Sequence, residues 1–254
     1  MRLASAFALF ASAFAVFPAL AGPASAVPAA APPLWSKALA LAAAQESLVP
    51  GKIVMHQELR SRSGELEHFG DTTLQVVPGK DGDVRAEVAA ASEDGKDVTA
   101  EARRRQRETE AKAAKRAKKT PQDDDTEVDL GDTPFAPKMR SKTTVRETAE
   151  RRTVDGRACV VHEISWPAKD GGRNKGRICL DEETGAPRDL VFSPDPLPKH
   201  VSAGKTSVRY RDDAPDGWRP RDMTIDGEGG ILFIKKKFHM VMTFSDYLRR
   251  PAKP

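Results

Sequence analysis

The residue types that could do chemistry are dispersed along this sequence. None of its histidines belongs to an H-x-x-x-H or H-E-x-x-H pattern, which would place two metal ligands on one helix face. They are His56, His68, His162, His200 and His239. Neither the G-x-S-x-G pattern of a serine nucleophile nor a phosphate-binding P-loop occurs. We therefore expect no metal, no cofactor and no enzymatic activity, with a periplasmic hydrolase built from dispersed residues as an alternative.

The two cysteines, Cys159 and Cys179, are expected to form a structural disulfide. Each lies in a predicted strand, and Asp170-Gly171 can turn the chain between them. Because there is no C-x-x-C motif, a reactive dithiol is the less favoured interpretation. A bridge closing about 20 residues contributes on the order of 3 kcal/mol in the chain-entropy model. Placing the cysteines directly opposite each other gives two suitable cross-strand pairs, Glu163 with Lys175 and Val160 with Ile178.

The last predicted strand, residues 231–247, has the most informative alternation. Every second residue is large and mostly apolar: Leu232, Ile234, Lys236, Phe238, Met240, Met242 and Phe244. Methionine thioethers adapt to varied shapes, so this face could line a cavity for acyl chains. The same spacing also suits an ordinary core packed beneath a helix. Leu232, Ile234, Phe238, Met240, Met242 and Phe244 are therefore candidate cavity residues.

The elements that would position these residues are mostly antiparallel strands. Alternating apolar and polar residues separated by Gly, Asp and Pro predict successive hairpins, without a βαβ rhythm. Early strands are expected around residues 53–55, 74–77 and 84–88. Later ones are expected at 140–152, 157–166, 175–181, 187–192, 205–212, 218–225 and 231–247, with Asp226-Gly227-Glu228-Gly229-Gly230 as a turn. Residues 34–48 predict a short amphipathic helix.

The first 26 residues have the three parts of an export signal. Arg2 gives a positive tip, residues 4–21 form a short alanine-rich apolar core, and Ala24-Ser25-Ala26 supplies small residues for a signal peptidase. We expect cleavage after Ala26, with residues 19–21 as an alternative site. No cysteine follows the apolar core, so we expect no lipid-modified N-terminus, and no later stretch is long and apolar enough to cross a bilayer. A periplasmic mature chain is predicted.

Residues 100–132 differ in composition from the rest of the chain. The first part is rich in strong helix formers but has no apolar stripe, and residues 122–132 are acidic. We expect a charged, exposed, partly disordered insertion within a single β-rich domain at 27–254. It is either a solvated spacer or an arm that touches anionic lipid or a partner. The net charge of +4 is too small to indicate nucleic-acid binding.

Several hairpin motifs carry a resemblance to a known group. Residues 134–137 (PFAP) precede a strand, residues 154–161 (VDGRACVV) read like "G-x-x-x-y-x-v", and residues 177–187 (RICLDEETGAP) are similar to "i-w-v-D-x-x-t-g-x-P". Residues 216–220 (DGWRP) are similar to a "dG-x-x-P" turn. Together they resemble the LolA/LolB-like outer-membrane lipoprotein-sorting group, over residues 133–248 and less closely over residues 34–99.

This resemblance implies an α+β fold made mostly of antiparallel β-structure. The expected architecture is an unclosed, curved sheet or half-barrel, whose concave apolar face is covered by the helix at 34–48. The expected function is a periplasmic, non-enzymatic carrier or binding protein for acyl chains or lipoproteins. Its partners would be a lipid or acylated protein, and other envelope proteins. The alternative is a structural or interaction protein of the cell envelope whose own helix fills the apolar face.

Overall fold

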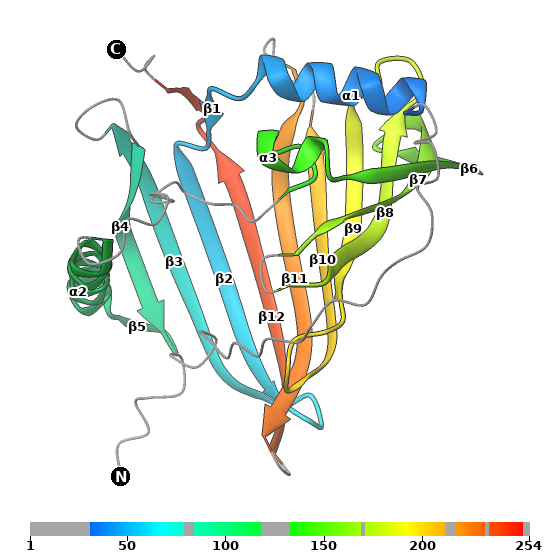
Figure 1. Ribbon diagram of the computed structural model, residues 1–254. Coiled ribbons are helices and arrows are strands. Elements are labelled where there is room, and N and C mark those ends of the chain that lie inside the picture. Colours follow the sequence, from blue (N-terminus) through cyan, green and yellow to red (C-terminus); the bar gives the residue numbers. More distant parts are fainter. Residues whose placement is uncertain are drawn as a thin grey trace. The chain divides into compact units, whose positions relative to one another are not determined.

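A computed structural model describes residues 31–78, 84–117, 133–168, 171–211, 217–231 and 234–250 (Figure 1). The predicted signal peptide and Leu232 lie outside these residues. The helices are α1 (Pro33–Ala44), α2 (Thr99–Ala117) and α3 (Pro137–Arg140). In chain order the strands are β1 (Leu48–Val49), β2 (Lys52–Ser61), β3 (Leu66–Pro78), β4 (Val84–Glu93), β5 (Lys96–Asp97), β6 (Thr144–Val154), β7 (Arg157–Pro167), β8 (Arg173–Asp181), β9 (Pro187–Asp195), β10 (Val201–Arg211), β11 (Arg219–Ile231), β12 (Ile234–Ser245) and β13 (Leu248–Arg249).

Two antiparallel meanders join into one large sheet. Its strand order is β5-β4-β3-β2-β12-β11-β10-β9-β8-β7-β6, so the pairing of β2 with β12 connects the two ends of the described chain. Asp155-Gly156, between β6 and β7, has positive φ angles of 48° and 77°, as a tight two-residue hairpin turn requires. The sheet is unclosed and curved, with β6–β8 turned in front of the central strands (Figure 1). The predicted fold class is confirmed.

The main core lies between the concave face of the sheet and α1. Trp35 of α1 is 2% exposed and belongs to one apolar cluster with Ala38, Ala42 and residues from both meanders. Its ring lies 5.3 Å from that of Phe135, which in turn lies 5.0 Å from that of Trp218. Figure 1 shows α1 running across one end of β9–β11. The predicted helix at 34–48 is therefore present as α1, which ends four residues earlier than expected.

The predicted disulfide between Cys159 and Cys179 is present, but its predicted register is wrong. Cys179 pairs with Val161 and not with Cys159, so the two cysteines are diagonal neighbours with Cα atoms 5.5 Å apart. The reason lies next to the turn, where the Ala168 amide donates to the Gly172 carbonyl at 3.2 Å and brings residue 168 opposite residue 172. The cross-strand pairs shift accordingly: Glu163 faces Arg177 in place of Lys175, and Val160 faces Leu180 in place of Ile178.

Helix α2, the described part of the expected insertion, lies along the outer side of β4, where the two-residue edge strand β5 pairs only with Ser92 and Glu93. The guanidinium of Arg103 donates to the Val88 carbonyl at 2.8 Å, and the Val88 amide donates to the Gln106 side chain at 3.1 Å. The Ala91 amide donates to the Thr99 hydroxyl at 2.9 Å. Because an edge strand otherwise exposes unpaired backbone groups, these polar side chains protect the β4 edge. None of the helices in the described part of the chain is long and apolar enough to cross a membrane.

Candidate functional site

The candidate residues of β12 lie on the concave face of the sheet. Phe244 pairs with Ile53 of β2, and Met242 pairs with Met55, so these side chains share a face with core residues. Met240 and Phe238 follow on the same face because side chains alternate along a strand. For Ile234 the structure describes only the backbone, which begins β12 and pairs with Ile231.

The covering of this face changes along β12. Phe244 is 1% exposed and belongs to the core cluster beneath α1, and Met242 is partly buried against the same cluster. Met240 and Phe238 are also partly buried, but they lie outside the residues that make up or flank the core cluster. One end of the face is thus filled by the protein's own helix. The other end is apolar and less completely covered.

Glycines lie beside the less covered end. Phe238 pairs with Gly227 of β11, and Gly227 pairs with Gly204 of β10. A Cβ atom built on Gly227 would meet only the Ala203 carbonyl oxygen, at 3.8 Å, so space is open above this position. On the other side, Phe238 pairs with Leu59 of β2. We call this surface the concave patch: Leu59, Gly204, Gly227, Phe238 and Met240.

The glycines of the patch were missed because the predicted turn at Asp226–Gly230 is wrong. These residues continue strand β11, and their ladder with β12 runs on to the pair Ile231 and Ile234. Close packing explains part of the glycine content, since a Cβ atom on Gly229 would lie 2.5 Å from the His200 carbonyl oxygen. The usable signal was the spacing of Gly227 and Gly229, which places both glycines on one face of a strand.

His162 is a buried polar residue on the same face as the core. It is 0% exposed, and its Nδ1 atom lies 3.1 Å from the Val160 carbonyl oxygen. Its Nε2 atom has no hydrogen-bond partner among the residues that the structure describes, and it lies 3.7 Å from the carboxylate of Glu147 on β6. Burial lowers the pKa of His162 below its ordinary value of 6.5, against the raising effects of Val160 and Glu147. Burial therefore favours the neutral ring in the folded protein.

We expect acidification from pH 7 to pH 5 to destabilise the fold through His162. The His162 ring binds a proton near pH 6.5 in the unfolded chain and only at lower pH in the folded protein. The free energy of unfolding is therefore unaffected by His162 above pH 6.5 and declines as the pH falls below it. Replacing His162 with leucine should flatten this part of the pH dependence, measured by urea unfolding. An unchanged slope in His162→Leu would contradict the assignment.

The other paired histidines form surface contacts with carboxylates. His56 lies 2.8 Å from Asp71, and His239 lies 2.7 Å from Asp226, on the convex face. The Asp71 hydrogen bond raises the pKa of His56, partly opposed by burial. No group of three His, Cys, Asp or Glu side chains able to hold a metal ion occurs among the residues described. Each of these two rings therefore has a carboxylate partner at the surface of the sheet.

In the comparisons with known proteins, solved structures are the matches that were found. No protein-family model matches it, and no curated protein matches it. A lipoprotein-sorting protein domain from Vibrio parahaemolyticus is 14% identical over 85% of this chain and 94% of its own, with a TM-score of 0.39. The LolA superfamily protein NE2245 from Nitrosomonas europaea is 8% identical over 86% and 92%, with a TM-score of 0.36. A DUF1329 family protein from Desulfovibrio piger is 11% identical over 88% and 95%, with a TM-score of 0.36.

The first two of these structures carry the names of the group that the sequence motifs resemble. The identities and TM-scores are low, so the function of this chain is inferred from its own residues.

Proposed function

We propose that this protein is a non-enzymatic periplasmic binding protein or carrier for acyl chains, including those of acylated proteins. The observation that carries this proposal is the concave patch. Its large side chains are apolar and only partly buried, and Gly227 leaves open space beside Phe238. The export signal expected in the first 26 residues supports the periplasmic location.

Burial of an alkyl chain supplies the binding free energy. Each methylene group transferred from water to an apolar surface contributes about 0.8 kcal/mol, as an upper guide. The flexible side chain of Met240 can adjust to chains of different shape. A charged pair lies beyond Phe238, near the start of β12, where the Lys236 ammonium forms an ion pair with Glu67. Lys236 would thus stand where a polar head group leaves the apolar surface.

The structural alternative draws support from the other end of the same face. Phe244 and Met242 already pack against the cluster that contains Trp35, so the protein's own helix fills that region. A protein in which the whole face serves as core would bind no acyl chain. Binding measured at the concave patch distinguishes the two functions.

Replacing Gly227 with leucine should weaken acyl-chain binding by about tenfold or more, equivalent to about 1.4 kcal/mol. The new side chain would occupy the open space beside Phe238. Folding should be retained, because removing a strand glycine is neutral or stabilising by roughly 0.5–1 kcal/mol. Binding is measured with a fluorescent fatty acid, and co-purified lipid is measured by native mass spectrometry.

Thr224→Leu is the matched control, because Thr224 lies on the same strand and pairs with Val241 on the opposite face. It should bind the probe like the unmodified protein. Loss of binding in both variants to the same extent would place the probe elsewhere. If no lipid co-purifies and no probe binds the unmodified protein, the carrier function must be abandoned in favour of the structural role.

A further inference from the structure

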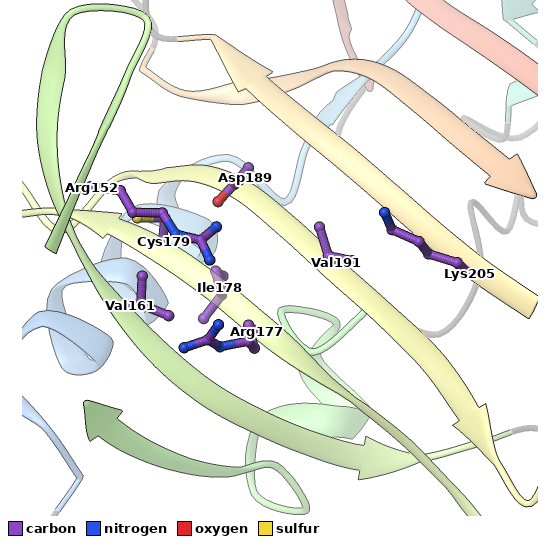
Figure 2. Close-up of a pocket in the computed structure, with 8 residues that line it drawn as sticks. All are labelled: Arg152, Val161, Arg177, Ile178, Cys179, Asp189, Val191 and Lys205. Carbon is purple, nitrogen blue, oxygen red and sulfur yellow. The ribbon is translucent and has the colours of Figure 1, made fainter. Parts of the chain in front are cut away.

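A cavity of about 240 Å³ lies on the convex face of the sheet, between β6 and β10 (Figure 2). Its apolar lining includes Val161, Cys179 and Val191. Cys179 is bonded to Cys159, and both are almost completely buried. Since Val161 pairs with Cys179 on the face opposite the core, this cavity is separated from the concave patch by the sheet itself. It is fixed to a rigid, cross-linked part of the fold.

Three positive side chains and one negative side chain line this cavity. Arg152, Arg177 and Lys205 come from β6, β8 and β10, and Asp189 comes from β9. In the view of Figure 2, the two arginines lie on either side of Ile178 and Lys205 approaches from β10. The charged lining residues thus have a net charge of two positive units, from three cations and one carboxylate.

Neighbouring acids leave part of this positive charge uncompensated. Glu150 accepts hydrogen bonds from both Arg152, at 2.6 Å, and Arg177. Each guanidinium carries five N–H donors, so one bond to Glu150 leaves further donors for another oxyanion. Asp189 faces Arg209 across β9 and β10, and the positive charge of Arg209 favours the ionised form of Asp189.

Lys205 has the least compensated charge of the group. Its side chain is exposed, and it forms no ion pair or hydrogen bond within the part of the chain that the structure describes. Asp226 is its cross-strand neighbour, but the Asp226 carboxylate bonds His239 at 2.7 Å. The Lys205 ammonium is therefore available to a ligand.

We propose that this convex cavity binds a phosphate group. Counted together with Glu150 and Arg209, the group has four cations and two carboxylates and keeps two positive units. A phosphate monoester carries a charge of about −1.5 to −2 at neutral pH, which matches this excess, whereas one carboxylate would neutralise half of it. Arginine forks suit phosphate oxygens, and Lys205 adds a point charge. The phosphate is either a free ion or the head group of a lipid, and the same three cations contact it in both cases. Asp189 limits affinity by repulsion.

Calorimetric titration of the full chain with inorganic phosphate at low ionic strength tests the site, with binding expected at a Kd on the order of 1 mM. Lys205→Met and Arg177→Met should each weaken binding by about two- to fivefold, as expected for exposed charge contacts. Asp189→Asn should strengthen it by a similar factor. Arg146→Met is the matched control, because Arg146 is an exposed arginine that pairs with Glu163 outside the cavity.

Vesicles of phosphatidylcholine with and without phosphatidic acid distinguish the two sources of phosphate. Binding of inorganic phosphate with the expected variant pattern supports a free ion. Binding only to vesicles that contain phosphatidic acid, with the same pattern, supports a lipid head group. Absence of both, or equal effects of Lys205→Met and Arg146→Met, overturns the proposal. The concave Gly227→Leu variant should bind phosphate normally, so failure here and failure of the acyl-chain function are separate results.

Discussion

Replacing Asp181 with asparagine should destabilise the protein by about 3–5 kcal/mol, the range measured when one partner of a buried ion pair is removed. Asp181 accepts hydrogen bonds from Arg188 at 2.6 Å and from the Thr184 amide at 2.9 Å, and both charged side chains are almost fully buried. Asparagine would keep a hydrogen-bonding side chain but remove the negative charge of Asp181 from the Arg188 guanidinium. Urea unfolding followed by circular dichroism measures the loss.

The Asp181 contacts have consequences for α1 because they shape the β8–β9 turn. The Glu183 carbonyl in this turn accepts a hydrogen bond from Lys37 of α1 at 3.0 Å. Gly185 has a positive φ of 76°, and a Cβ atom there would lie 2.6 Å from the Lys37 side chain. A weakened turn should therefore loosen the helix above the concave face. Hydrogen exchange in residues 33–44 should rise in Asp181→Asn.

The pH dependence gives an independent check on Asp181. Burial opposes its ionisation, but the hydrogen bonds from Thr184 and Arg188 outweigh this effect and lower the pKa to about 2, from an ordinary value of 3.8. Its stabilisation is therefore complete above about pH 4 and is lost as the pH falls towards 2. The stability curves of the two proteins should converge over this range. Parallel curves would contradict the assignment.

Two controls separate the ion pair from a general loss of charge. Glu163→Gln removes a carboxylate from an exposed pair with Arg146 and should cost less than about 1 kcal/mol. Asp181→Asn combined with Arg188→Met should recover part of the lost stability, since the buried guanidinium is then removed together with the charge of Asp181. A cost for Asp181→Asn as small as that of Glu163→Gln would mean that the buried pair is not important for stability.

The strands of the sheet were predictable because local sequence determines them. Alternation of apolar and polar residues marked β7 at 157–166, and the observed strand is Arg157–Pro167. Asp155-Gly156 marked the hairpin before it, because both residues tolerate positive φ. The presence of the disulfide also followed from strand positions. Its register did not, since the observed pairing moves every partner by two residues, and a two-residue shift leaves the alternation of faces unchanged.

What could not be predicted depends on contacts between distant segments. Phe244 and Met240 occupy equivalent positions in the alternation along β12, so the sequence predicts the same surroundings for both. Their surroundings differ because α1 covers Phe244 and not Met240. The convex cavity likewise brings Arg152 and Lys205 together from strands about 50 residues apart. The packing of α2 against β4 could not be predicted from the polar residues of the helix. The side chains of Arg103 and Gln106 bond backbone groups of β4, and the positions of backbone groups do not depend on residue type.

Replacing Trp35 with alanine should also cost about 3–5 kcal/mol, as for other buried tryptophans. Trp35 is 2% exposed and contacts Phe135, which connects α1 to the ring of Trp218 on the sheet side of the core. A helix of 12 residues is marginal in isolation, so α1 depends on such packing. Ser36→Ala, at an exposed position of the same helix, should change stability little. Urea unfolding measures both variants.

The same substitution tests how α1 limits the apolar face. If the acyl chains that we propose as ligands bind beside Phe238, detaching α1 should expose Met242 and Phe244 as well, and the extended apolar surface should hold a fluorescent fatty acid more tightly. Gly227→Leu combined with Trp35→Ala should then regain part of the binding that Gly227→Leu loses. Weaker probe binding by a folded Trp35→Ala variant would mean that α1 forms part of the binding surface and does not merely cover it.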